Sequence, residues 1–312
     1  MQGLELSKKY YLTCAENLFR QELGDNFFKL AIGLAGEGSE CFGFDDEISS
    51  DHDFEPSFCI WLTKEDYEIF GFKLERLYAK LPSEFLGFYR QTQSNISCRR
   101  GVMPLDDFYL KFLGSPCAPS SLEQWLSLPC HSLACACNGE VFVDNLGNFS
   151  AVRKELLKGY PLDVRLKKIA AHCALMAQSG LYNYKRCIAR SENGAAQLCV
   201  FQFVKNAISA VYLINNVYQP FYKWAYKGLR NFKTLSELEN SLVALSVLGN
   251  TPDEAKAKNE SMEEICALIT RAINEQNLLS KPCDNIEKCA FILQNSIQDV
   301  SLRNMHLMDG IE

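Results

Sequence analysis

The order of apolar and polar residues divides the chain into a first part with strand and helix patterns and a second part with helix patterns alone. In the first part, short apolar runs predict strands, and apolar residues at helical spacing predict amphipathic helices. Thr63, with Asp66 three residues later, is typical of a helix start. The pattern predicts helices over residues 4–23, 63–80, 105–113 and 121–128, strands over residues 30–35, 54–62 and 139–144, a mixed strand and loop region over residues 82–101, and a loop over residues 133–137.

From residue 150 onward, glycine and proline become rarer and the apolar spacing is helical. Residues 195–218 are apolar around most of the circumference, which predicts the central helix of a bundle. Gly180 is expected to end one helix, and Thr251 followed by Pro252 is expected to begin another. The pattern predicts helices over residues 163–179, 184–190, 195–218, 235–248, 255–279 and 285–307.

These patterns predict an α/β (α+β) N-terminal domain with a mixed sheet flanked by helices, followed by an all-α helical bundle. We place the boundary so that residues 1–150 form the first domain and residues 151–312 the second. A length of 312 residues suits two domains, and 47% apolar residues suffice for two cores.

Charge and cysteine usage narrow the class of protein. The net charge of −6 argues against a nonspecific nucleic-acid binder, which would be basic. The chain has 14 cysteines and shows no signal-peptide pattern and no apolar run long enough to span a bilayer, so we expect a cytoplasmic protein with reduced thiols and no membrane partner. Cys135-Ala136-Cys137 and Cys283 with Cys289 lack the paired spacing of zinc sites.

The most informative stretch is residues 36–55, which lies between two predicted strands. It holds a glycine-rich turn that includes Gly38 and Ser39, where free backbone N–H groups and a hydroxyl could hold the oxygens of an anion. Asp51 and Asp53 alternate on an extended segment, so their carboxylates face the same side. Two such carboxylates suit a hard divalent cation. The stretch therefore indicates a site for a metal-bound nucleoside triphosphate.

Gly38-Ser39, an eleven-residue spacer and then Asp51-His52-Asp53 resemble the signature of the polymerase-beta-type nucleotidyltransferases. The wider stretch from Gly38 to Asp53 resembles a bacterial branch of uncharacterised nucleotidyltransferase-like proteins with a helical C-terminal domain of unknown function, and more distantly the aminoglycoside nucleotidyltransferases. Three downstream stretches contribute to this resemblance, at residues 139–147, 160–164 and 220–224. His52 departs from the family, in which the residue between the two aspartates is usually apolar.

The resemblance implies a third carboxylate on a later strand. Glu140 and Asp144 lie on the strand predicted over residues 139–144, and a regular strand would turn both to the same side. The resemblance favours Glu140 as general base or third metal ligand, and Asp144 begins a sequence typical of a turn. The alternative for Glu140 is a solvated carboxylate next to a turn.

Two basic features accompany the acidic ones. Arg99 and Arg100 could meet phosphates, but a pair of solvated surface charges is the simpler interpretation. The resemblance implies that Lys223, in Pro220-Phe221-Tyr222-Lys223-Trp224, faces the triphosphate or the substrate. The alternative is a surface lysine whose aromatic neighbours pack in the core.

Together these features imply a metal-dependent enzyme that moves a nucleoside monophosphate, AMP from ATP by the family's default, to a hydroxyl and releases pyrophosphate. The first domain would be catalytic and the second a substrate or lid domain. The acceptor stays open among a small molecule, a protein and an RNA, and the oligomeric state is open as well. The predicted residues are Asp51, Asp53 and Glu140 for catalysis, Asp51 and Asp53 for two Mg²⁺ ions, and Gly38, Ser39, Glu40 and Lys223 for the nucleotide.

Two other functions compete with this one. A degenerate member of the fold could bind nucleotide as a sensor without chemistry, and His52 and the third carboxylate keep that alternative open. An antitoxin-like enzyme could instead modify a protein or RNA hydroxyl.

Overall fold

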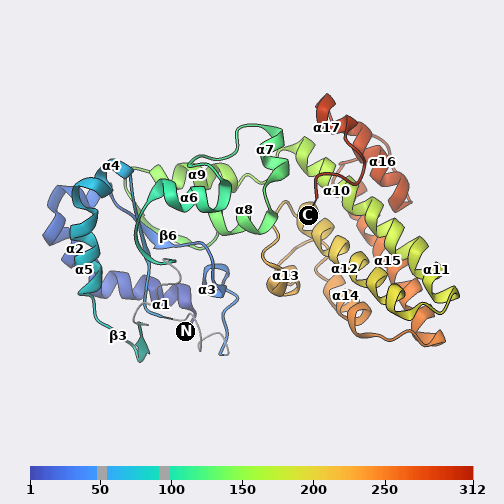
Figure 1. The fold of residues 1–312 in the computed structure, drawn as a ribbon, viewed down its shortest axis with the longest axis horizontal. Coiled ribbons are helices and arrows are strands. Elements are labelled where there is room, and N and C mark those ends of the chain that lie inside the picture. Colours follow the sequence, from blue (N-terminus) through green and yellow to red (C-terminus); the bar gives the residue numbers. More distant parts are fainter. Residues whose placement is uncertain (48–54, 91–98, 312) are drawn as a thin grey trace. The chain divides into compact units, whose positions relative to one another are not determined.

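The computed structural model of the protein describes residues 1–47, 55–90 and 99–311 (Figure 1). Two compact units divide the chain: Met1–Pro119 with Ser132–Lys158, and Ser120–His131 with Gly159–Glu312. The predicted boundary after residue 150 thus falls inside the first unit, within its last helix, α9 (Asn148–Leu156). All described strands belong to the first unit, so the chain is mixed α/β, with a small mixed sheet and many helices.

The sheet of the first unit has the strand order β5-β2-β1-β6. Its strands are β1 (Ala31–Leu34), β2 (Cys59–Leu62), β5 (Gly101–Pro104) and β6 (Glu140–Asp144). Strand β1 is antiparallel to both β2 and β6, whereas β2 and β5 are parallel. A separate two-stranded hairpin, β3 (Glu84–Phe85) with β4 (Phe88–Tyr89), lies in the region predicted as strand and loop.

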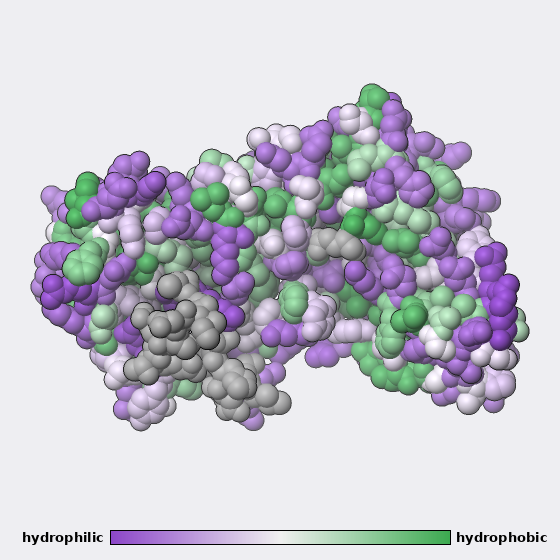
Figure 2. Space-filling model, in the orientation of Figure 1, coloured by the Kyte–Doolittle hydropathy of each residue, from purple (hydrophilic) through white to green (hydrophobic). Residues whose placement is uncertain are grey.

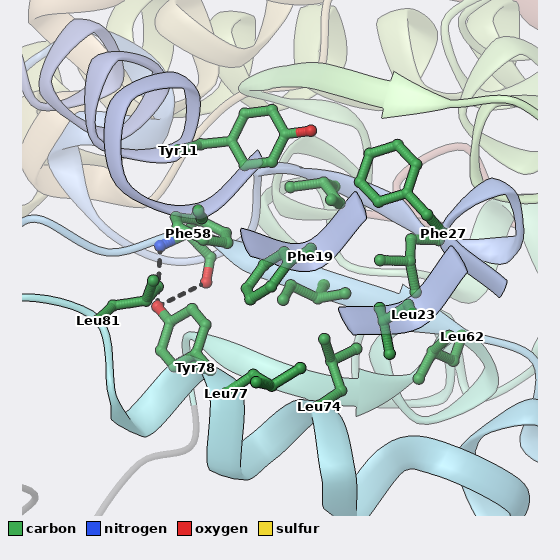
Figure 3. Close-up of a cluster of buried hydrophobic side chains, with 14 of the residues drawn as sticks. Tyr11, Phe19, Leu23, Phe27, Phe58, Leu62, Leu74, Leu77, Tyr78 and Leu81 are labelled. Carbon is green, nitrogen blue, oxygen red and sulfur yellow. Dashed lines mark hydrogen bonds between the residues drawn. The ribbon is translucent and has the colours of Figure 1, made fainter. Parts of the chain in front are cut away.

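One face of the sheet is covered by the helices that precede β1 and follow β2. Ile32 pairs with Ile60 and with Val143, and Ile60 pairs with Val102, so these side chains form one apolar row. Figure 3 shows the core packed against this face, where Tyr78 holds Phe58 by accepting from its N–H at 3.1 Å and donating to its carbonyl at 3.0 Å. The covering helices are α1 (Gly3–Tyr10) and α2 (Glu16–Leu23), joined by a π-helical segment at Tyr11–Ala15, and α4 (Lys64–Asp66) and α5 (Phe72–Ala79), joined by another at Tyr67–Gly71; a 3₁₀ segment at Gly24–Lys29 leads into β1.

The other face is covered by α6 (Leu105–Leu113) and α9. Trp61 of β2 stacks on Phe149 of α9 with ring centroids 3.9 Å apart and meets Phe108 of α6 edge-on at 5.3 Å. The helices predicted over residues 4–23, 63–80 and 105–113 are therefore confirmed, and both faces of the sheet are buried.

The described part of the second unit is helical. Helix α12 (Asn193–Ile214) is 22 residues long, is extensively buried and packs against several other helices of the unit. The remaining helices are α7 (Leu122–Ser127), α10 (Leu162–Met176), α11 (Tyr184–Ala189), α13 (Tyr222–Leu229), α14 (Leu238–Val247), α15 (Pro252–Glu275), α16 (Ile286–Ser296) and α17 (Val300–Asn304), while α8 (Cys130–Cys137) crosses the division between the units.

Helix α12 alone among the described helices is long and apolar enough to cross a membrane. However, 61% of the most apolar 18-residue stretch of this helix is buried inside the protein, as in the core helix of a soluble bundle. On the face shown in Figure 2, hydrophilic residues cover most of the surface and apolar residues form small separate groups. The structure is consistent with a soluble protein.

Three sequence-based expectations about helices are wrong. The loop predicted over residues 133–137 belongs to α8; because Leu133 to Cys137 are all buried, they show no apolar periodicity. Gly180 does not end α10, since a π-helical segment at Ala177–Asn183 carries the helix on into α11. The helix predicted over residues 285–307 is two helices, because Asp163 accepts the N–H groups of Gln298 and Asp299 between them.

Gly180 is needed for close packing rather than for a turn. A Cβ atom there would lie 2.4 Å from Cδ2 of Phe203 and 3.1 Å from Sδ of Met262. We expect Gly180→Ala to lower the free energy of unfolding by about 1–3 kcal/mol through overpacking. Gly194→Ala in α12 is the matched control: nothing lies within 4 Å of the added methyl group, and the change should be neutral or stabilising by up to about 1 kcal/mol. Thermal and urea unfolding of the full chain measure both, and equal stability of the two variants would contradict this packing argument.

Candidate functional site

The register of the sheet brings the ends of four chain segments to a single edge. Leu34, the last residue of β1, pairs with Glu140, the first residue of β6. Gly33 pairs with Cys59, the first residue of β2, and Cys59 pairs with Gly101, the first residue of β5. The last residues of β1 and the first residues of β2, β5 and β6 therefore lie at the same edge of the sheet, the edge formed by the strand ends. The glycine turn leaves the sheet at this edge, and Glu140 enters the sheet there.

The residues that lead into β2 reach the same edge. Asp51, His52 and Asp53 precede β2 in the chain and lie outside the described residues, as does Phe54, the first residue of the predicted strand. The described strand β2 begins at Cys59. Among the described residues, no group of three or more His, Cys, Asp and Glu side chains is arranged to hold a metal ion.

The glycine turn runs from Gly36 into the short helix α3 (Ser39–Phe42). Gly36 has a φ of 106° and Gly38 a φ of 119°, a region that residues with a side chain rarely adopt. A Cβ atom on Gly38 would lie 2.4 Å from the carboxylate of Glu40. The Ser39 hydroxyl is partly exposed and makes no hydrogen bond with another described residue. Gly38 is thus required by the backbone, and Ser39 carries an available hydroxyl beside it.

The segment before β6 fixes the turn from one side. The Asn138 side chain accepts from the Gly36 N–H and donates to the Gly36 carbonyl, both at 2.8 Å. The Gly139 N–H donates to the Cys41 carbonyl at 2.9 Å. A Cβ atom on Gly139 would lie 1.8 Å from the Leu34 carbonyl oxygen, so only glycine permits this approach. Sequence reasoning missed Asn138, because only the fold reveals its partner 102 residues away.

The buried guanidinium of Arg100 fixes the turn from the other side. It donates to the carbonyl of Glu37 at 2.8 Å and to the carbonyl of Ala35 at 3.4 Å, and it forms an ion pair with Glu40. Only 11% of the Arg100 side chain and 10% of the Glu40 side chain are exposed. The interpretation of Arg99 and Arg100 as two solvated charges is therefore wrong for Arg100. Glu40, predicted to contact the nucleotide, is buried and pairs with Arg100.

The thiols around this ion pair do not add charge. Burial raises the pKa of the Cys41 thiol and that of the Cys59 thiol, so both stay protonated at neutral pH. Arg100 also donates to Cys41 Sγ at 3.2 Å. Glu40 is consequently the charged partner that balances Arg100 among these buried groups.

Glu140 and Asp144 do not share a side of β6, contrary to the expectation for a regular strand. The pairing shifts between Ile32 and Gly33, so that Val143 pairs with Ile32 but Val141 pairs with Gly33, and Phe142 is the extra residue of the bulge. Glu140 forms an ion pair with Lys8 of α1. Asp144 lies at the opposite end of the strand, opposite Ala31.

Asp144 has a structural partner there. Its carboxylate accepts the Ser150 N–H of α9 at 2.8 Å, and the Gly147 N–H donates to its carbonyl at 3.3 Å. Of the two candidates for a third carboxylate, Glu140 is the one at the edge that holds the glycine turn.

Helix α1 flanks this edge. In addition to Lys8, its Ser7 hydroxyl donates to the Ser57 carbonyl at 2.6 Å, and the Gly3 N–H donates to the Asp45 carboxylate at 2.7 Å. Asp45 follows the glycine turn and Ser57 precedes β2. Helix α1 thus contacts the described chain before and after residues 48–54, the stretch of the sequence that contains Asp51 and Asp53.

Lys223 belongs to the second unit, in the first turn of α13. It is exposed, and its Nζ lies 4.5 Å from the centre of the Trp224 ring, a cation–π distance. Trp224 is half-buried, and Ala225 behind it is buried. The aromatic partner restricts the lysine side chain while leaving its charge on the surface.

In the comparisons with known proteins, part of the chain is similar to a domain family of unknown function. A family model described as a domain of unknown function, DUF4037, matches residues 125–225. The matched stretch includes Glu140 and Lys223 and takes in parts of both units. No curated protein and no solved structure shows significant similarity to the chain.

Arg100 offers a direct test of how the turn is held. We expect Arg100→Met to lower the free energy of unfolding by about 3–5 kcal/mol, because the change leaves Glu40 buried without its counter-charge. The neighbouring Arg99→Met is the matched control: Arg99 pairs with Glu37 at 3.5 Å in a partly exposed ion pair, whose loss should cost less than about 1 kcal/mol. Urea unfolding of the two variants measures the difference, and similar losses would show that Arg100 is not the anchor.

Proposed function

We propose that the protein is a metal-dependent nucleotidyltransferase that moves a nucleoside monophosphate, AMP from ATP, to an acceptor hydroxyl with release of pyrophosphate. The observation that supports this most is the shared sheet edge: the glycine turn, the entry to β2 that follows Asp51 and Asp53 in sequence, and Glu140 all reach it. The resemblance of the signature gives the reaction class. In this proposal the first unit is catalytic, the helical unit binds substrate, and the protein is cytoplasmic.

The side chains available suit magnesium. Asp51 and Asp53 supply hard oxygen ligands of the kind that Mg²⁺ prefers, and a backbone turn without a side chain at Gly38 suits polyphosphate. The family resemblance implies two Mg²⁺ ions. Mg²⁺ held by the two aspartates would offset phosphate charge and make the acceptor hydroxyl more acidic.

Gly38 and Ser39 would bind the β- and γ-phosphates. The absence of a Cβ atom at Gly38 lets oxygen atoms approach the backbone closely, and the Ser39 hydroxyl can donate a hydrogen bond. Glu40 would serve as a positioning residue: its ion pair with Arg100 holds the turn in the conformation that Gly38 requires. The family resemblance assigns Lys223 of the second unit to the triphosphate or the substrate, for which a compact ammonium charge is suited.

Glu140 would act as the general base. The acceptor oxygen attacks the α-phosphorus, the bond to the pyrophosphate oxygen breaks, and the acceptor proton passes to the Glu140 carboxylate. The Lys8 ammonium orients that carboxylate, and both side chains remain partly exposed, 46% for Lys8 and 40% for Glu140, so an acceptor can reach it.

The two aspartates test the reaction class. We expect Asp51→Asn and Asp53→Asn to abolish pyrophosphate release from Mg²⁺-ATP across a broad acceptor panel while the circular dichroism spectrum is unchanged, because the metal loses a charged ligand. Asp25→Asn, at an exposed position in the segment before β1, is the control and should keep full activity. Labelled ATP with cell lysate shows whether label moves to a protein, an RNA or a small molecule. Nucleotide binding without pyrophosphate release by the unaltered protein would favour the sensor alternative, and normal transfer by the double variant would refute the assignment.

Glu140 and Asp144 form a matched pair on one strand. Glu140→Gln should lower the rate of pyrophosphate release by about a hundredfold or more, since it removes the proton acceptor. Asp144→Asn should leave the rate within a few-fold and lower the free energy of unfolding by about 1 kcal/mol, because its partner is the Ser150 N–H. Steady-state kinetics with urea unfolding separate the two effects, and a larger loss of rate in Asp144→Asn would reverse the assignment.

A further inference from the structure

Two cysteines of the helical unit lie on neighbouring helices that pack against each other. Cys187 belongs to α11 and Cys199 to α12, and a short turn joins the two helices (Figure 1). Both cysteines are free thiols in the structure, and both belong to the second unit. Neither has a part in the proposed nucleotidyl transfer, so the pair is independent of that function.

The turn sets the two helices side by side. The Cys187 carbonyl accepts the Arg190 N–H at 3.1 Å and the Glu192 N–H at 3.0 Å. The Glu192 carbonyl accepts the Ala196 N–H at 2.9 Å, which begins the hydrogen bonding of α12. Ser191 has a φ of 57°, the left-handed conformation that ends a helix and reverses the chain. Because the reversal takes only a few residues, the last turn of α11 lies against the first turns of α12.

Each cysteine borders the buried side of its own helix. Tyr184, three residues before Cys187, and Ala196, three residues before Cys199, are both fully buried. Residues three apart lie on the same side of a helix, so each cysteine continues a buried stripe. Both cysteines are half-buried, which places them where that stripe meets the solvent.

The two thiols meet at this boundary. Burial raises the pKa of the Cys199 thiol, and the charge of Cys187 and a hydrogen bond with its side chain raise that pKa further. A hydrogen bond raises the pKa of a thiol when it favours the protonated form, so Cys199 donates and Cys187 accepts. Cys199 therefore keeps its hydrogen at neutral pH, and Cys187 is the sulfur left to react.

A second pair of thiols in the same unit differs in its access to solvent. Cys173 of α10 and Cys289 of α16 are both 0% exposed. A hydrogen bond with Cys289, together with burial, raises the pKa of the Cys173 thiol, so these two side chains also meet. Oxidation of a thiol requires exposure, and the buried pair is therefore a control for the half-buried one.

We propose that Cys187 and Cys199 form a reversible redox pair that hydrogen peroxide oxidises to an intramolecular disulfide. The Cys187 sulfur attacks one peroxide oxygen, the O–O bond breaks, and Cys187 becomes a sulfenic acid while the other oxygen leaves as water. The Cys199 sulfur then attacks the sulfenic sulfur, the S–O bond breaks, and the Cys199 hydrogen leaves with that oxygen in a second water. A dithiol reductant restores both thiols by exchange.

The turn can absorb the approach that bond formation requires. An S–S bond is about 2.05 Å long, which is shorter than a contact between two thiols. The residues from 190 to 194 are all exposed, so the turn can shift without loss of packing in the core.

Peptide mapping of the full chain tests the proposal. The folded protein is treated with hydrogen peroxide, the remaining thiols are blocked with N-ethylmaleimide, and trypsin then cleaves after Arg186, Arg190 and Lys205. Because one of these cleavage sites lies between the two cysteines, the disulfide joins peptides 187–190 and 191–205. We expect this joined peptide, lighter than the sum of its parts by two hydrogen atoms, and its loss after dithiothreitol.

The buried pair shows whether oxidation occurs in the folded state. Cys173 and Cys289 should stay reduced under the same treatment, in peptides 169–185 and 289–303. Absence of the joined peptide from Cys187 and Cys199 would overturn the proposal. Equal oxidation of the buried pair would overturn it as well, because the reaction would then follow unfolding.

Two serine variants separate the attacking sulfur from the second one. In Cys199→Ser, peroxide should leave Cys187 as a sulfenic acid that dimedone traps, whereas Cys187→Ser should give no dimedone adduct at Cys199. An unchanged circular dichroism spectrum shows that each variant folds. Equal adducts in the two variants would contradict the assigned order of the two steps. No nucleotide enters these measurements, so their outcome and that of the proposed transfer reaction are distinguishable.

Discussion

The glycine turn depends on one buried charge. Arg100, placed directly before β5, reaches the carbonyls of Ala35 and Glu37 and the carboxylate of Glu40. A buried guanidinium is costly unless its donors are satisfied and its charge is matched. The turn is therefore stable only in a conformation that keeps these acceptors next to Arg100. The order β5-β2-β1-β6 makes the contact possible, since the parallel pairing of β2 with β5 delivers Arg100 to the edge at which β1 ends.

A glycine and an amide side chain also hold the turn at this edge. Gly139 passes the Leu34 carbonyl at a distance that no side chain allows, and Asn138 satisfies both polar groups of the Gly36 peptide backbone. Each contact ties the start of β6 to the turn that follows β1. Glu140 therefore enters the sheet at a position fixed by backbone contacts, and its role as a base would rest on that placement.

Much of the architecture could be predicted from local sequence, while most of the site's support could not. The helix beginning at Thr63 has its cap in the sequence, and the capping oxygen accepts from the Asp66 N–H as expected. Arg100 and Asn138 gave no such signal, because their partners are distant in sequence. The bulge at Phe142 was equally invisible, since a register shift depends on the neighbouring strand.

The ion pair between Arg100 and Glu40 limits how much charge the glycine turn can offer to a nucleotide. A guanidinium already matched by a buried carboxylate offers little net attraction to a triphosphate, so the turn contributes shape and hydrogen-bond donors rather than charge. Under the proposed reaction, the compensating charge would come from cations held by Asp51 and Asp53.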